Sequence, residues 1–326
     1  NVPVIEYINN RARVLGLSKL YQYASVTKGQ RGEELSDMGK LYQAGVRILS
    51  DDGMPVENAN LMRLALSYAK NFGMLIISHC EEKSLAADGV MNEGSVSASL
   101  GLKGINHAAE EVMVARDVIL AESLDTRIHI AHVSTAGSVA IIRDAKRRSI
   151  KVTCETAPHY FSATDEMCLG FNTLAKVNPP LRTTRDIKAI CDGLRDGTID
   201  CIATDHAPHH IDDKNTVFNQ AANGISGFET AFALAVTNLL NKNVISLPEI
   251  VRLMSGNPAH IMGIPAGTLN IGDCADITIA DINRTWTVNP DKFVSKGKNT
   301  PFGGSVLTGA IMYTIVDGQI IFRRED

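Results

Sequence analysis

Short apolar runs alternate with helical patterns along the first 260 residues. Apolar runs with the length and bounding turn residues of strands lie at 20–26, 46–49, 74–77, 127–131, 150–154 and 199–205. Helical spacing of apolar residues covers 4–15, 35–44, 58–72, 108–122, 137–147, 185–195, 227–240 and 248–254. This alternation of strand and helix predicts a parallel sheet with helical crossovers.

Polar residues at the strand ends distinguish two kinds of parallel sheet. A doubly wound sheet concentrates its site at one switch point, commonly beside a glycine-rich phosphate loop, and the sequence contains no such loop. In a (β/α)8 TIM barrel, functional residues come from the carboxyl ends of several strands. Here five strands are followed by Asp52, His79, His132, His159 and Asp205. The sequence therefore predicts an α/β fold of the (β/α)8 barrel type, of which six strands can be counted.

The pattern changes after Pro265. Short β runs with turn residues between them follow at 275–280, 306–307, 311–317 and 319–322, without a helical pattern. We expect a barrel domain at 1–263 and a small β subdomain at 264–326.

Composition narrows the class of protein. The chain is 44% hydrophobic and 21% charged with a net charge of −4, which is typical of a soluble globular protein and argues against a polyanion-binding surface. Six scattered cysteines without a C-x-x-C pair indicate buried thiols in a reducing compartment. No apolar stretch approaches the roughly 18 residues of a membrane span, and no signal peptide precedes the first helix, so a cytoplasmic location is expected.

Four of the strand-end residues form a potential metal-binding set. Asp52, His79, His132 and Asp205 offer carboxylate and imidazole ligands suited to Zn²⁺ or a similar divalent ion. Each residue also has an ordinary explanation, since Asp-Gly is a common turn, a lone histidine is often a core residue and residues 201–210 could be a histidine-rich surface loop. Their recurrence at the same place relative to four strands favours the metal site.

The remaining histidines carry weaker signals. His129 lies three positions before His132 and so points to the opposite face of a regular strand. His107, His129 and His260 are expected to be structural or exposed, whereas His159 and His210 receive no assignment.

Several motifs resemble the dihydroorotases, and specifically the type of cyclic amidohydrolase with an aspartate where its relatives carry a carboxylated lysine. These motifs are SDDG at 50–53, SHCEE at 78–82, HIAHVS at 129–134, KVNPPLR at 176–182, ATDHAPH at 203–209, GISGFET at 224–230, NPA at 257–259 and TPFGG at 300–304. The resemblance extends over essentially the whole chain and implies reversible hydrolysis of (S)-dihydroorotate to N-carbamoyl-L-aspartate in de novo pyrimidine biosynthesis.

The resemblance also implies roles for individual residues. Asp52 would bridge two Zn²⁺ or other divalent ions, His79 and His132 would complete one of them, and Asp205 would bind the other and act as general acid/base. Substrate would be held by Asn178, His209, Asn223 and Gly224. The polar segment 209–219 would form a mobile loop over the site. A homo-oligomer and association with aspartate transcarbamoylase are both compatible with the resemblance, and neither nucleic acid nor membrane is expected as a partner.

One family motif is missing. Dihydroorotases of this type begin with a strand carrying His-x-His-x-Arg and a second strand ending in an asparagine, and neither occurs before His79. We therefore expect an N-terminally incomplete chain that lacks the first two βα units. Such a chain would bind metal weakly and turn over poorly by itself.

Three alternatives stay open at this point. Another cyclic amidohydrolase, such as a hydantoinase or allantoinase, would usually have the lysine that this chain replaces with Asp52. A non-catalytic scaffold for aspartate transcarbamoylase would not need the retained acids and histidines. Within the site, Arg182 is either a clamp for the substrate carboxylate or a structural residue behind two prolines.

Overall fold

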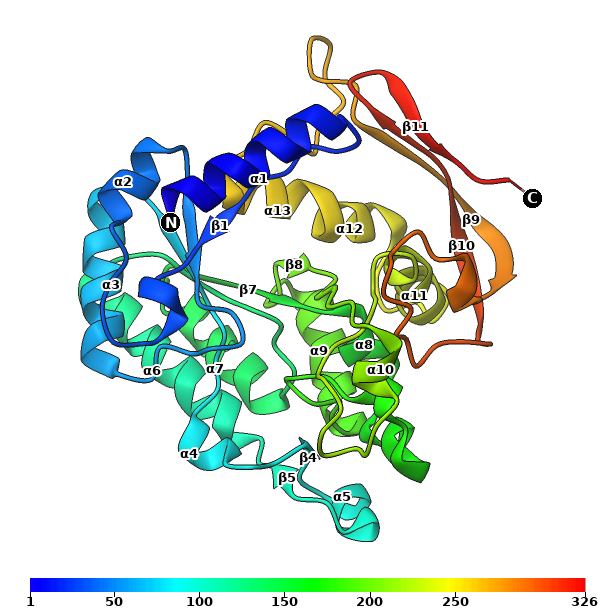
Figure 1. Cartoon of the computed structure of the whole chain (residues 1–326), viewed down its shortest axis with the longest axis horizontal. Coiled ribbons are helices and arrows are strands. Elements are labelled where there is room, and N and C mark those ends of the chain that lie inside the picture. The colour runs from blue at the N-terminus through cyan, green and yellow to red at the C-terminus, as the bar shows by residue number, and fades with distance from the viewer. Residues whose placement is uncertain (326) are drawn as a thin grey trace.

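The computed structural model describes residues 1–325, and its centre is a parallel sheet of six strands (Figure 1). The strand order follows the chain and all five pairings are parallel. The strands are β1 (Tyr23–Ala24), β2 (Ile48–Ser50), β3 (Leu75–Ser78), β6 (Ile128–Ile130), β7 (Val152–Thr156) and β8 (Cys201–Ile202). The predicted strands are present, but β1 and β8 are shorter than the apolar runs at 20–26 and 199–205.

Helices connect these strands and cover one face of the sheet (Figure 1). Polar residues start several of them: the side chain of Asn58 accepts from Leu61 N at α3, and Thr135 accepts from Ser138 N at α7. The helix α1 (Val2–Leu15) precedes the first strand. The main helices between the strands are α2 (Met38–Gln43), α3 (Ala59–Asn71), α6 (Ala108–Leu124), α7 (Ala136–Arg147) and α9 (Thr184–Asp196).

The two faces of the sheet pack differently. Leu49, Ile76 and Ile130 belong to the main core beneath the helices. On the other face, Ile48 and Ile77 form a small cluster with residues from the helix that precedes the C-terminal sheet. All residues of β2, β3 and β6 are buried, as expected when both faces of a parallel sheet are covered.

Smaller elements interrupt the alternation. They are α4 (Lys83–Ala86), β4 (Met91–Asn92), α5 (Ser95–Leu100), β5 (Gly104–Ile105), α8 (Pro158–Ser162) and α10 (Ile211–Lys214), with 3-10 turns at η1 (Lys28–Gln30), η2 (Asp165–Phe171), η3 (Thr173–Ala175) and η6 (Pro290–Lys292). Strands β4 and β5 pair in parallel, away from the main sheet (Figure 1). The apolar periodicity did not predict this excursion, because its elements are only two to six residues long.

The chain then forms two helical stretches and a second sheet. The helical stretches are α11 (Ala231–Ala235) with the π turn η4 (Val236–Leu240), and α12 (Leu247–Val251) with the π turn η5 (Arg252–Gly256) and α13 (Asn257–Met262). The second sheet is antiparallel and consists of β9 (Ile277–Thr287), β10 (Val306–Val316) and β11 (Gln319–Arg323). It lies beside α11 at the edge of the molecule (Figure 1), which agrees with the β subdomain expected after the barrel. Within residues 1–325, no helix combines the length and apolarity that crossing a bilayer requires.

Candidate metal centre

Three side chains from adjacent strand ends meet at one edge of the sheet. Asp52 follows β2, His79 follows β3 and His132 follows β6, and these strands are neighbours in the sheet. His79 Nδ1 lies 2.8 Å from His132 Nε2. The Asp52 Oδ1 atom is 3.2 Å from the same His132 nitrogen and 3.3 Å from the His79 nitrogen. One oxygen and two nitrogens therefore face a common point.

This triangle fits a divalent ion. Two imidazole nitrogens and a carboxylate oxygen all present lone pairs, so their close approach needs either hydrogen-bonding protons or a metal ion between them. Tetrahedral zinc with ligands at about 2.0–2.1 Å would separate them by about 3.3 Å, which matches the 3.2 and 3.3 Å spacings from Asp52, while the two imidazole nitrogens lie closer at 2.8 Å. The imidazoles are buried, whereas the Asp52 side chain is 57% exposed, so the group is open to solvent on one side.

The charges of the group favour a cation at that point. Burial alone would raise the pKa of the Asp52 carboxyl, but hydrogen bonds from His132 and His79 outweigh it and hold this pKa well below its usual range. Burial likewise opposes protonation of His132, but the bond to Asp52 and the charge of Asp205 raise the pKa of His132 to about 9. A bound metal would replace this stabilised proton.

Asp205 lies close by but outside this triangle. It is three residues beyond β8, and its Oδ2 is 3.7 Å from the Nε2 of His159, which has no hydrogen-bond partner among residues 1–325. Burial raises the pKa of Asp205 and lowers that of His159 to about 3. Of the four predicted ligands, the structure thus brings Asp52, His79 and His132 together, with Asp205 beside His159.

Backbone conformation sets these residues apart from their neighbours. His132 has φ = 31° and Asp205 has φ = 46°. Positive φ values are uncommon for residues other than glycine, and such conformations are concentrated at functional sites. The sequence gives no sign of this feature.

Glu81 connects the triangle to a predicted substrate residue. Its Oε2 accepts a 2.6 Å hydrogen bond from Asn178 Nδ2 and lies 3.9 Å from His79 Nε2. The pKa of Glu81 is lowered: burial opposes this change, but His79 and Asn178 more than offset it. The sequence places Glu81 only inside the SHCEE motif, and its link to Asn178 spans 97 positions of chain.

The other predicted substrate residues lie together. His209 Nε2 is 2.8 Å from the carbonyl oxygen of Asn223, and Gly224 follows with φ = 145°. A Cβ atom at Gly224 would stand 2.6 Å from the carbonyl oxygen of Ala207, so this position requires glycine. The buried side chain of Asn299 joins both pieces, because its Oδ1 accepts from His209 N and its Nδ2 donates to the Gly224 carbonyl.

The structure decides between the two readings of Arg182. Its side chain is buried and donates to Ser134 Oγ, Asn92 Oδ1 and the carbonyl oxygen of Ile105. These bonds support the structural role. His129 is buried too, bonded to Thr153 and 3.2 Å from Glu155, as expected for a structural histidine.

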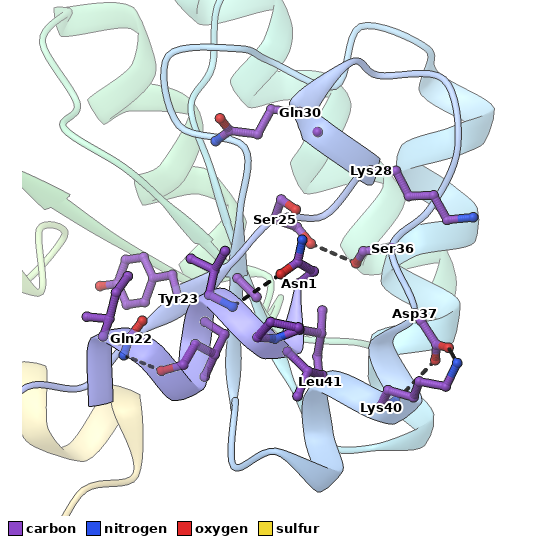
Figure 2. Close-up of a pocket in the computed structure, with 17 residues that line it drawn as sticks. Asn1, Gln22, Tyr23, Ser25, Lys28, Gln30, Ser36, Asp37, Lys40 and Leu41 are labelled. Atoms are coloured by element: carbon purple, nitrogen blue, oxygen red, sulfur yellow. Dashed lines mark hydrogen bonds and ion pairs between the residues drawn. The ribbon is translucent and has the colours of Figure 1, made fainter. Parts of the chain in front are cut away.

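A distinct pocket of about 740 Å³ lies between α1 and the segment from Gln22 to Leu41 (Figure 2). Its lining residues all come from positions 1–41, whereas the metal-binding triangle begins at Asp52. Within its wall, Ser36 Oγ donates to the carbonyl oxygen of Ser25. None of the residues that line this pocket belongs to the metal-binding triangle.

The parallel α/β sheet, the Asp/His group at its strand ends and the antiparallel C-terminal sheet agree with a metal-dependent amidohydrolase of the (β/α)8 barrel type. Residues 182–322 match a family described as the amidohydrolase family, and residues 2–138 match a family described as dihydro-orotase-like. L-hydantoinase (dihydropyrimidinase) from Arthrobacter aurescens superposes with a TM-score of 0.83 at 25% identity, covering 100% of this chain and 75% of that one. Dihydropyrimidinase from Brevibacillus agri has the same fold, with a TM-score of 0.76 at 21% identity over 87% of this chain and 65% of that one.

Sequence identity to known proteins shows which family of amidohydrolases contains this chain. A dihydroorotase from Acetivibrio thermocellus is 54% identical over 325 residues, which cover 100% of this chain and 76% of the relative. A dihydroorotase from Geobacter metallireducens is 54% identical over 324 residues, covering 99% of this chain and 76% of that protein. The chain belongs to the dihydroorotase family. The predicted barrel fold and the family resemblance are confirmed, whereas the roles assigned to single site residues stay predictions.

Proposed function

We propose that this chain catalyses the reversible hydrolysis of (S)-dihydroorotate to N-carbamoyl-L-aspartate in de novo pyrimidine biosynthesis. The observation that carries the proposal is the convergence of Asp52, His79 and His132 in a chain 54% identical to a dihydroorotase. Opening a cyclic amide at neutral pH needs a strong nucleophile and a proton for the departing nitrogen. The triangle and Asp205 are suited to these two tasks.

The chain's own residues divide the chemistry between them. A divalent ion held by Asp52, His79 and His132 would supply a nucleophile at neutral pH, because such ions lower the pKa of water to about 7. Asp205 takes the proton released by the nucleophile and returns it to the ring nitrogen as the amide bond breaks. Its raised pKa suits this role, because a carboxyl whose pKa lies nearer the working pH can both accept the proton and give it back.

Substrate is held from the other side of the site. Asn178, kept in place by Glu81, offers its side-chain amide, and its Oδ1 is buried without a partner among residues 1–325. His209 and the backbone at Asn223 and Gly224 offer further polar contacts to the dihydroorotate ring and its carboxylate. Together these groups orient the ring so that its amide carbon faces the metal-binding triangle.

The identity of the metal, the location of the enzyme and its partners are proposed from ligand chemistry, cysteine content and the family resemblance. Two imidazoles with one carboxylate favour Zn²⁺ among common divalent ions, and Asp205 would help to hold a second ion. The six free cysteines suit a cytoplasmic enzyme. Association with itself or with aspartate transcarbamoylase is proposed on the resemblance alone.

The test is ring opening of three substrates by the purified chain, with Zn²⁺ present and after chelation. We expect dihydroorotate to be opened faster than hydantoin or allantoin, whatever the absolute rate, and this activity to be lost on chelation. Preferential opening of hydantoin or allantoin would assign the chain to another cyclic amidohydrolase activity. Stable binding of aspartate transcarbamoylase with no turnover of any substrate would support the scaffold alternative.

A further inference from the structure

Two buried lysines lie behind the predicted substrate-binding residues. Lys214, in α10, has only 1% of its surface exposed, and its Nζ donates to three backbone carbonyls: Thr173 at 3.2 Å, Lys176 at 2.9 Å and Ala222 at 2.6 Å. In residues 210–220, Lys214 and Phe218 are buried and the remaining residues are exposed. Lys214 and Phe218 are therefore the two buried anchors of this segment.

The second lysine makes the reciprocal contact. Lys176 is buried on the facing segment, and its Nζ donates to the carbonyls of Phe218 at 2.9 Å and Asn219 at 3.0 Å. Thr173 Oγ1 adds a 2.6 Å bond to the Lys214 carbonyl. Each segment thus inserts an ammonium group into the backbone of the other, and we call the pair Lys176 and Lys214 the lysine clasp.

Packing alone does not explain lysine at these positions. Burying an ammonium group is costly unless hydrogen bonds replace its water, and a methionine of similar shape would avoid that cost. Among residues 1–325, neither ammonium lies within 4.0 Å of a carboxylate oxygen, so backbone carbonyls are their direct partners. Burial and the charge of Lys176 lower the pKa of Lys214 to about 8, and burial lowers the pKa of Lys176.

The bonds of the clasp end beside the predicted substrate contacts. The carbonyl of Lys176 accepts from both Lys214 Nζ and the backbone N–H of Gly224, the latter at 3.0 Å. Lys176 also precedes Asn178 by two residues. The carbonyl of Ala222, bonded to Lys214, directly precedes Asn223, whose own carbonyl contacts His209. The clasp therefore connects the backbone on both sides of the substrate site.

We propose that Lys214 and Lys176 are positioning residues that hold the 209–224 segment and Asn178 in register for substrate. This inference rests on the proposed function and adds two residues that the motifs did not assign. It also gives the 209–219 segment a fixed base, because Lys214 ties the segment to the carbonyls of Thr173 and Lys176.

The test compares the full chain carrying Lys214→Met with wild type and with Lys188→Met. Lys188 is an exposed lysine on α9 paired with Asp192, and serves as the matched control. In Lys214→Met we expect amide hydrogen exchange in residues 211–224 to accelerate at least about tenfold, because hydrogen bonds to a charged group are lost. The KM for dihydroorotate should rise about tenfold, with kcat within about threefold and metal content unchanged. Lys188→Met should match wild type in all three readouts.

Two outcomes would overturn the proposal. One is wild-type exchange in 211–224 and a wild-type KM in the Lys214→Met variant; the other is acceleration spread evenly over the chain, which marks a general packing role. If Lys214→Met does not fold, the same readouts are taken on Lys176→Met. Hydrogen exchange in the wild type adds a second test, because a rapidly exchanging Gly224 amide would contradict its bond to the Lys176 carbonyl and so the clasp. Faster opening of hydantoin or allantoin than of dihydroorotate by the wild type would refute the proposed function, whereas the exchange readout would still decide the clasp.

Discussion

The metal-binding triangle and the 206–226 segment, which contains the 209–224 segment held by the lysine clasp, are built in opposite ways. Asp52, His79 and His132 each follow a buried parallel strand, so the sheet itself brings them together. The 206–226 segment contains little regular structure and takes its shape from distant polar partners. One is Asn299, 90 positions from His209, and another is the Lys176 backbone, 38 positions from Lys214.

This difference matters for how each region should respond to change. A residue of the triangle can be replaced with little effect on the sheet, because the strand hydrogen bonds do not depend on it. In the 206–226 segment, position and stability depend on the same contacts. We therefore expect changes in the triangle to abolish chemistry while sparing the fold, and changes in the segment to affect substrate binding and local stability together.

The largest effect is expected for Asp52→Asn. An amide is a poor metal ligand, so metal content should drop and turnover should fall by about a thousandfold or more, equivalent to about 4 kcal/mol of transition-state stabilisation. Above about pH 9, where His132 has lost the proton that Asp52 stabilises, the free energy of unfolding of the metal-free protein should change little, because the Asp52 side chain is 57% exposed. Metal analysis, steady-state kinetics and denaturant titration measure the three quantities.

The adjacent acid is a matched control. Asp51 is buried and accepts hydrogen bonds from Val26 N, Thr27 N and Thr27 Oγ1. Asp51→Asn should therefore lower stability by about 1–3 kcal/mol while metal binding is retained. If the two variants exchanged these properties, the metal-binding assignment would be wrong.

A smaller loss is expected for Asp205→Asn. Removing a general acid/base typically costs about 10²–10⁴ in kcat. Metal held by Asp52, His79 and His132 should persist, since Asp205 lies outside their triangle. Asp212→Asn, an exposed acid in the nearby segment, provides the comparison. Wild-type kcat in Asp205→Asn would remove this residue from the proton path.

Gly224→Ala should affect the segment rather than the chemistry. Its φ of 145° and the 2.6 Å approach of a Cβ to the Ala207 carbonyl both oppose alanine. We expect a loss of about 1–3 kcal/mol in stability and a raised KM with a nearly unchanged kcat. Gly256→Ala is the control, since Gly256 is helical and the nearest atom to its Cβ is 3.9 Å away. Equal KM values in the two variants would contradict a role for Gly224 in substrate binding.

The effect with no expected consequence for catalysis concerns pH. His159 is buried with its pKa lowered to about 3, whereas in the unfolded chain an imidazole titrates near 6.5. Between these values the unfolded state binds a proton that the native state does not, so stability falls as pH falls from 6.5 towards 3. One proton contributes a slope of at most about 1.4 kcal/mol per pH unit.

His159→Gln should remove that contribution. Denaturant titrations of metal-free wild type and variant between pH 4 and 7 measure the difference in slope directly. His107→Gln, at an exposed histidine, is the matched control for the substitution itself. Parallel slopes for wild type and His159→Gln would show that the buried imidazole is not held neutral.

The sequence correctly predicted those parts of the fold that depend on short apolar runs along the chain. The runs at 46–49, 74–77 and 127–131 became β2, β3 and β6, and the polar residues after them meet as expected from parallel strands. The spacing of apolar residues could not predict contacts such as Glu81 with Asn178 or Lys214 with the 173–176 carbonyls. Those contacts depend on loops whose course is set by the folded barrel.

Burial of a charged group is equally hard to predict from pattern. Lys214 lies in a polar stretch that indicates an exposed loop, yet it is among the most buried side chains of residues 1–325. His159 follows a predicted strand but received no role, because its neighbour Asp205 is 46 positions away. In both cases the missing information is the partner, which only the fold supplies.

The central claim is that Asp52, His79 and His132 hold one divalent ion at the ends of three adjacent strands. Anomalous X-ray diffraction at the zinc edge, on crystals of the full chain grown with Zn²⁺, tests it most directly. The account predicts a peak about 2.0–2.2 Å from His79 Nδ1, His132 Nε2 and Asp52 Oδ1. Zinc bound only elsewhere, or an empty triangle at saturating Zn²⁺, would contradict it.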